Sequence, residues 1–229
     1  MEFIVLLIMV VILYFLLIFI FDFNIKKLKS IGEDKELDKL TQKYPENVEI
    51  CKEYLKMLNN DSVVIEEDKN SSTTLFLVMS NKIFIADLKD SYTRIQTIAH
   101  ECLHSIQSKK MLWFNFIFSN VYLMYFFVFC ILGVCKLVPY KMLFLSIFMV
   151  LGFVFFAVRS FLENDAMIKA RFLAKEYMQN KMLSTADEIE LIVKKFDVLN
   201  DIGIKCTNFQ LLANVFFKIV VLLVIFVVF

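Results

Sequence analysis

The sequence predicts a mainly α-helical membrane protein with about four transmembrane helices and a small β-sheet outside the membrane. Hydrophobic residues make up 59% of the 229 residues, whereas soluble globular domains usually contain about 45–50% apolar residues. The excess collects in a few long blocks, each of about the length that a membrane-spanning helix requires. The segments between the blocks carry most of the lysines and arginines and show both helix and strand patterns.

Composition also limits the class of protein. The formal net charge is +1, and no stretch interleaves basic and aromatic residues, so we expect no nucleic-acid partner. The five cysteines form no Cys-x-x-Cys pair, and two of them lie inside an apolar block. We therefore expect reduced thiols instead of a disulfide framework at Cys51, Cys102, Cys130, Cys135 and Cys206.

Three apolar blocks precede the C-terminal one. Residues 3–23, "FIVLLIMVVILYFLLIFIFDF", are long enough to span a bilayer. No basic residue precedes this block and no small-residue cleavage site follows it, so we predict a retained transmembrane anchor at 1–23. The next two blocks run from about Leu112 to Cys135 and from about Met142 to Val158. They predict a transmembrane hairpin at 112–158.

The last apolar block, "NFQLLANVFFKIVVLLVIFVVF", predicts a C-terminal transmembrane helix at 208–229. Lys218 lies within this block, and a lysine near the middle of a span is costly unless it snorkels or faces protein. We prefer a tilted span with a snorkelling lysine. The alternative is a helix that lies in the membrane interface up to Lys218.

The basic residues predict the orientation. Residues 24–111 carry 14 Lys/Arg, residues 159–207 carry eight, and the turn between the second and third blocks carries two. The positive-inside rule therefore places both polar segments in the cytoplasm and the N-terminus outside. Because the chain crosses the membrane twice between them, the two segments can act together on one side.

The first polar segment, 24–111, predicts an α+β arrangement. Apolar residues at three- and four-residue spacing indicate helices within 24–60, separated at Pro45. Three short β-branched or aromatic runs, "SVVIEED", "TTLFLVMS" and "KIFIADL", indicate two or three strands of a small sheet. The pattern becomes helical from Ser91 to Lys110, and we expect this helix to continue into the second apolar block.

The second polar segment, 159–207, predicts two helices. The first continues directly from the third apolar block to about Met182. The second begins in "STADEIELIVKKFDVL", where Thr185 and Glu188 have the spacing of a capping box.

Both histidines of the chain lie in "TIAHECLHSIQ", residues 97–107. On the predicted helix, His100 and His104 lie one turn apart, opposite an apolar stripe of Ile95, Ile98, Ala99, Cys102 and Ile106. Imidazoles at i and i+4 can bind one metal ion, and Glu101 is near enough to reach a water on that ion. In this chemistry zinc acidifies the water, and the glutamate takes its proton as the water attacks a carbonyl. The alternative is a solvated helix face with two ordinary histidines.

A catalytic zinc needs a third protein ligand and an open coordination position. The chain has no third histidine, so the ligand must be a carboxylate or, less readily, a cysteine, and Cys102 faces the apolar stripe. We predict Glu163 as this ligand, with Asp165 as the rival; alternatively, both are interfacial acids near Arg159. Glu163 shares its helix face with small residues that let a second helix approach, namely Ala166, Ala170 and Ala174.

"TIAHECLHSIQ", followed two spans later by "LENDAMIKARFLA", resembles the neutral zinc metallopeptidases of the YugP type. Those proteins have a His-Glu-x-Gly-His-x-x-Gln helix after one N-terminal span, then two spans, a Glu-x-Asp-Ala segment and an apolar C-terminal stretch. The matching positions are His100, Glu101, His104, Gln107, Glu163, Asp165, Ala166 and Ala170. The resemblance implies that His100, His104 and Glu163 bind zinc and that Glu101 is the catalytic base.

Two positions depart from related patterns. Leu103 replaces the glycine before the second histidine, which makes this chain a divergent member of that type. Met167 occupies the aspartate position of the Glu-x-x-x-Asp signature of HtpX-type membrane proteases, and that signature therefore fails here.

The candidate ligands lie close in sequence to the predicted spans. His104 would be about 12 Å from Leu112 along a continuous helix, and Glu163 closely follows Val158. We therefore expect a zincin-like, more narrowly gluzincin-like, metal site at the cytoplasmic face of the cell membrane. The hypothesis is a Zn²⁺-dependent endopeptidase that cleaves membrane proteins or membrane-tethered peptides. The alternatives are a non-catalytic membrane protein with a structural or sensory zinc site, and an adaptor without metal.

Overall fold

A computed structural model of the chain describes residues 34–68, 71, 73–86 and 91–229, and residues 8, 10–12, 14, 15, 18 and 19 near the N-terminus. Most of the anchor predicted at 1–23 therefore lies outside the described residues. The chain divides into two compact units. One contains Trp113–Phe161 and Lys205–Phe229, and the other contains Leu162–Ile204 and the described part of Asn24–Leu112. We call the second the site unit.

Two short helices begin the described part of the site unit, α3 (Lys35–Thr41) and α4 (Asn47–Met57). The Asp34 carboxylate caps α3 by accepting from the backbone N–H groups of Glu36 and Leu37. The two predicted helices are confirmed here, with Pro45 between them. One face of α4 is buried in the core through Ile50, Cys51, Tyr54 and Leu55.

The three predicted strand runs form one small sheet of β1 (Val64–Asp68), β2 (Leu75–Leu77) and β3 (Lys82–Ala86). The strand order is β1-β3-β2, with β1 parallel and β2 antiparallel to β3. The central strand β3 is the most buried, which fits its β-branched residues. β2 is an edge strand, so one row of its backbone groups faces away from β3.

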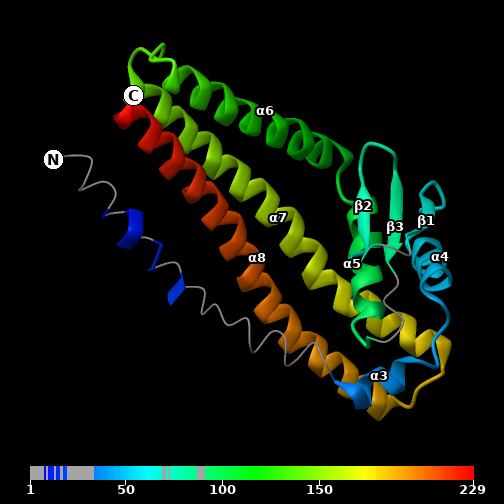
Figure 1. The fold of residues 1–229 in the computed structure, drawn as a ribbon. Coiled ribbons are helices and arrows are strands. Elements are labelled where there is room, and N and C mark those ends of the chain that lie inside the picture. The colour runs from blue at the N-terminus through cyan, green and yellow to red at the C-terminus, as the bar shows by residue number, and fades with distance from the viewer. Residues whose placement is uncertain are drawn as a thin grey trace. The chain divides into compact units, whose positions relative to one another are not determined.

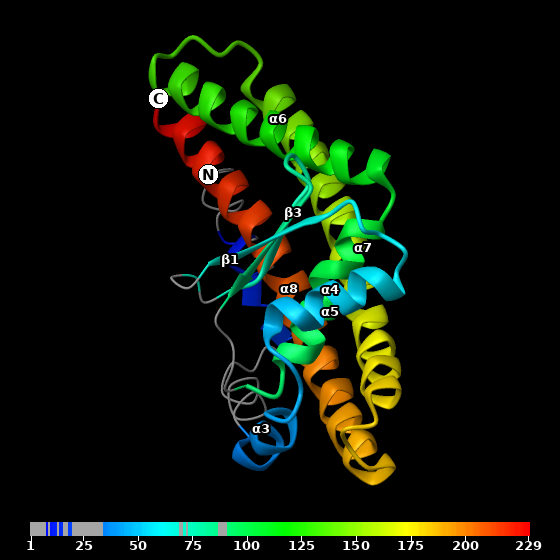
Figure 2. The same cartoon turned by 90° about the vertical axis from the view of Figure 1, so that its right-hand side faces the viewer.

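The histidine helix is α5 (Arg94–Ile106), which contacts α4, β2 and β3 (Figures 1 and 2). Its predicted apolar stripe is fully buried at Ile95, Ile98, Ala99 and Cys102. The prediction is wrong for Ile106, which is 46% exposed, because the helix ends there and no further turn continues the buried face.

The predicted continuous helix from His104 to Leu112 is also wrong. Gln107 has extended backbone angles, φ −61° and ψ 160°, which end α5. The next helix, α6 (Lys109–Val134), begins two residues later. Because the helix breaks here, the Gln107 side chain does not lie along a helix surface. It contacts His104, Leu162 and Asp165 instead.

The two long helices α7 (Lys141–Lys181) and α8 (Ala186–Val228) each cross the predicted borders between apolar and polar segments without interruption. The capping box at the start of α8 is confirmed. The N–H of Glu188 donates to Thr185 Oγ1 at 3.3 Å, and the N–H of Thr185 donates to Glu188 Oε2 at 2.8 Å.

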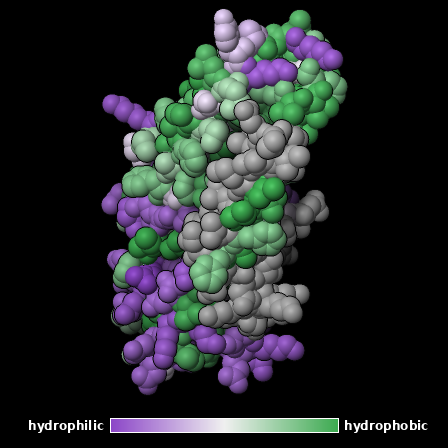
Figure 3. Space-filling model, turned by 90° about the vertical axis from the view of Figure 1, so that its left-hand side faces the viewer, coloured by the Kyte–Doolittle hydropathy of each residue, from purple (hydrophilic) through white to green (hydrophobic). Residues whose placement is uncertain are grey.

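Three helices, α6, α7 and α8, are long and apolar enough to cross a membrane. Figure 3 shows hydrophobic side chains gathered on one part of the surface and strongly hydrophilic ones on another. The helices pack closely in their own unit, since a Cβ at Gly152 would lie 2.7 Å from Val215 Cγ1. Lys218 lies over protein rings, with Nζ 5.2 Å from the centroid of Tyr122 and 5.9 Å from that of Phe155, so cation–π contacts accompany this lysine.

One buried guanidinium fastens α5 to the α3–α4 segment. Arg94, the first residue of α5, is 3% exposed. Its Nη1 donates at 2.7 and 2.9 Å, and its Nη2 donates at 2.8 and 2.9 Å. The four acceptors are Pro45 O, Asn47 Oδ1, Thr41 O and Tyr44 O. The start of the histidine helix is thereby fixed.

We expect Arg94→Met to lower the free energy of unfolding by about 3 kcal/mol, because four acceptors lose a charged donor. Arg94→Lys should recover only part of this, since an ammonium group cannot reproduce the planar fork. Thermal unfolding of detergent-solubilised protein, followed by far-UV circular dichroism, measures the stability loss of each variant. The control is Arg171→Met, which removes a partly exposed ion pair with Asp197 and should cost less than about 1 kcal/mol. Equal losses for both arginines would contradict the prediction.

Candidate metal centre

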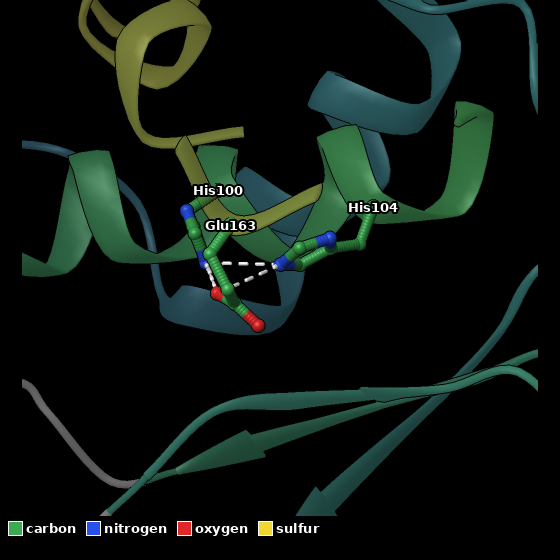
Figure 4. Close-up of side chains that lie close together, drawn as sticks. All are labelled: His100, His104 and Glu163. Atoms are coloured by element: carbon green, nitrogen blue, oxygen red, sulfur yellow. Dashed lines mark hydrogen bonds and ion pairs between the residues drawn. The ribbon is translucent and has the colours of Figure 1, made fainter. Parts of the chain in front are cut away.

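Two imidazoles and one carboxylate converge in the site unit (Figure 4). His100 and His104 come from α5 and Glu163 comes from α7. The two Nε2 atoms lie 3.1 Å apart, and Glu163 Oε2 lies 3.5 Å from the first and 3.6 Å from the second. This group of three residues could hold a metal ion.

The spacing of the three ligand atoms fits a single small divalent ion. In a tetrahedral shell with ligand bonds of about 2.0–2.1 Å, neighbouring ligand atoms lie about 3.3 Å apart. The observed separations of 3.1, 3.5 and 3.6 Å lie on both sides of that value. The three side chains are 12–15% exposed, so the group is sheltered but still reachable.

Gln107 orients the second imidazole. Its Nε2 donates to the backbone carbonyl of Leu162 at 2.8 Å and to Asp165 Oδ2 at 3.2 Å, which fixes the orientation of the amide. Its Oε1 therefore faces His104 Nδ1 at 2.9 Å and accepts the Nδ1 proton. The Nε2 lone pair of His104 is then left facing Glu163, as a metal ligand requires.

Asp165, the rival third ligand, takes a different place. It is not one of the three converging residues. Its Oδ2 accepts from Gln107, and its Oδ1 lies 2.6 Å from Lys169 Nζ. Cys102 is not part of the candidate metal group either. Its buried Sγ lies 3.6 Å from Cys51 Sγ. As expected, all five cysteines are free thiols.

Glu101 lies beside the candidate ligands, and strand β2 fixes its carboxylate by a hydrogen bond. Its Oε2 accepts from the backbone N–H of Phe76 on β2 at 2.7 Å, and its Oε1 lies 3.9 Å from His100 Nε2. Burial raises the pKa of the Glu101 carboxyl above its ordinary value, although His100, His104 and the bond from Phe76 act in the opposite direction. The arrangement fixes one carboxylate oxygen and leaves the other beside the candidate ligands.

The sequence pattern did not predict the contacts of Gln107 and Phe76. In the sequence, Gln107 is one of the positions that match the YugP-type pattern. Its position three residues after His104 is the signal that could have indicated its hydrogen bond with that imidazole. Phe76 contributes a backbone N–H, which every residue except proline has, so no residue type marks it.

Comparison of the chain with protein-family models, with curated proteins and with solved structures gives no match. The chemical interpretation of the centre therefore rests on its own residues and their geometry.

We expect Gln107→Ala to weaken Zn²⁺ or Co²⁺ binding about 10- to 100-fold, as loss of a partner that orients a ligand typically does. The imidazole of His104 would lose the acceptor that sets its tautomer. Competition with a chromophoric chelator measures the dissociation constant. Gln179→Ala, at an exposed position of α7, is the matched control and should leave the affinity unchanged. Equal affinity of Gln107→Ala and the control would contradict this role.

The metal-free protein should lose stability as the pH rises from about 4.5 to beyond 6.5. Burial would lower the pKa of His104, but Glu163, Glu101 and Gln107 outweigh burial and raise it above its ordinary 6.5. The pKa of Glu101 is raised above its ordinary 4.5. Both groups therefore keep protons in the folded state at pH values where the unfolded chain has lost them, so folding becomes less favourable as the pH increases.

Thermal unfolding of chelator-treated protein between pH 5 and pH 8 tests this pH dependence. The midpoint should fall with pH, and the slope should become smaller in His104→Gln and in Glu101→Gln. A midpoint that stays constant or rises in the unsubstituted protein would show that these two groups do not titrate as described.

Proposed function

We propose that this protein is a membrane-bound, gluzincin-like zinc metallopeptidase that hydrolyses peptide bonds at the cytoplasmic face of the cell membrane. His100, His104 and Glu163 would bind the zinc, and Glu101 would act as the general base. The observation that supports this most strongly is the convergence of three ligand atoms at tetrahedral spacing beside a further carboxylate.

The donor set favours a catalytic over a structural zinc site. Structural sites are usually closed by four protein ligands, whereas catalytic sites have three and leave one position open. Here two imidazoles and one carboxylate make up the group found among the described residues. A bound zinc would supply Lewis acidity, which acidifies a water and polarises a peptide carbonyl.

Glu101 is the residue that a structural site does not need. The bond from Phe76 holds one carboxylate oxygen, so the other can accept a proton beside the ligands without reorientation. Its raised pKa brings the carboxyl closer to the range in which it can take a proton from water and pass it to a leaving amine. These are the two transfers that peptide hydrolysis requires.

Chain connectivity supports a location at the membrane. Glu163 lies on the continuous helix α7, whose N-terminal part is apolar enough to span a bilayer. The histidine helix ends three residues before α6, another apolar helix, begins. The distribution of lysine and arginine favours the cytoplasmic side. We infer from this location that the substrates are membrane proteins or membrane-tethered peptides.

Glu101→Gln should retain zinc and lower hydrolysis at least about 100-fold, the scale of a lost general base. The amide oxygen of glutamine can still accept from Phe76, so the fold should be unchanged. Full-length protein in nanodiscs is assayed with a membrane-anchored fluorogenic peptide, and metal content is measured by mass spectrometry. The control is Glu176→Gln, at an exposed position of α7, which should keep full activity.

Three results would count against the proposal. Zinc-loaded protein that cleaves no peptide would favour the structural or sensory site, in which Glu101→Gln changes nothing. Purified protein that holds iron instead of zinc would indicate a different chemistry for the same ligands. Equal cleavage of soluble and membrane-anchored peptides would contradict the inferred substrate class.

A further inference from the structure

A pocket of about 230 Å³ lies against the first candidate ligand, within the site unit. Three helices line it. α5 contributes Thr97 and His100, α7 contributes Met167, and α8 contributes Leu199 and Gly203. Met167 lies four residues, or about one helical turn, after Glu163 on α7. The pocket therefore borders the candidate metal centre at His100.

The pocket is predominantly apolar and carries no formal charge. None of the residues that the structure places around it is a lysine, arginine, aspartate or glutamate. Two buried amides among its lining residues join its walls: Gln96 Nε2 donates to Asn200 Oδ1, and Asn200 Nδ2 donates to the carbonyl of Met167 at 3.0 Å. These bonds connect α5, α8 and α7, so the walls of the pocket are linked independently of any ligand.

We propose that this pocket receives an uncharged, apolar side chain of the substrate residue next to the scissile bond. The inference rests on the proposed function and adds the substrate class to it. An apolar side chain would exchange water for Met167 and Leu199, and a difference of one methylene in such a pocket typically changes affinity 10- to 200-fold. A lysine or glutamate side chain would lose its hydration and find no opposite charge among the residues that line the pocket.

Gly203 offers a direct way to fill the pocket. A Cβ built at Gly203 would meet no atom within 4 Å. A leucine there therefore starts in open space at a position that lines the pocket, and replacing a glycine inside a helix favours the helix. Val198→Leu is the matched control, since it adds bulk to α8 at a position that is 39% exposed and outside the pocket.

The test uses hydroxamates that bind zinc and carry one variable side chain next to the metal-binding group: methyl, isobutyl, benzyl, aminobutyl or carboxyethyl. Calorimetric titration of zinc-loaded, full-length protein gives each dissociation constant without turnover. We expect isobutyl or benzyl to bind at least tenfold more tightly than methyl, and the charged compounds to bind no better than methyl. Gly203→Leu should reduce the ratio of benzyl to methyl affinity at least tenfold, and Val198→Leu should preserve that ratio.

The outcomes separate the pocket from the peptidase. Equal affinities for all side chains, a preference for a charged one, or an unchanged ratio in Gly203→Leu would overturn the pocket inference, even if peptides are cleaved. The expected affinities without peptide cleavage would support the pocket and refute the peptidase. Failure of every hydroxamate to bind zinc-loaded protein would overturn both.

Discussion

The side chain of Gln107 joins the two helices that carry the candidate ligands. Its carbonyl oxygen accepts from His104, and its amide nitrogen donates to the backbone of Leu162, the residue before Glu163. Its own backbone ends the histidine helix. One residue thus sets the tautomer of one ligand, positions the segment that bears another and turns the chain toward α6. These bonds help to hold ligand atoms from two separate helices within 3.6 Å of each other.

The side of the histidine helix that faces away from the ligands is fixed by ordinary core packing, and one buried acid lies beside the ligands. Ile95, Ile98 and Cys102 are fully buried, as the core-facing side of an amphipathic helix should be. Glu101 is also buried, and an acid there raises the cost of folding because its charged form is poorly solvated. The edge strand β2 offsets part of this cost through Phe76. Buried acids with shifted pKa values gather at functional sites more than elsewhere, which is why the place of Glu101 beside the potential metal ligands bears on function.

The same long helices serve both compact units. α7 and α8 run without a break from apolar segments, which are suited to lipid, into segments that line the candidate centre and the neighbouring pocket. The face of α7 that bears Glu163 also carries Ala166, Ala170 and Ala174, all fully buried. Small side chains on that face leave space for the elements that pack against it, and Met167 then contributes apolar surface beside the ligands.

The sequence by itself determined the features that depend on local periodicity and residue chemistry. These are the apolar helices α6, α7 and α8, the small sheet, the capping box at Thr185 and the two histidines on one face of a helix. The three-dimensional arrangement decided what depends on distant contacts. It placed Glu163 with the imidazoles and Asp165 against Gln107, because that choice depends on the rotation of α7 relative to α5.

The sequence also did not predict the helix break at Gln107, because the residue pattern on both sides of it remains helical. The hydrogen bonds that stabilise the break are accepted by groups of α7. The bond from Phe76 to Glu101 and the pocket beside His100 were equally invisible. A backbone N–H has no residue signature, and a pocket enclosed by α5, α7 and α8 exists only once helices far apart in the chain have come together.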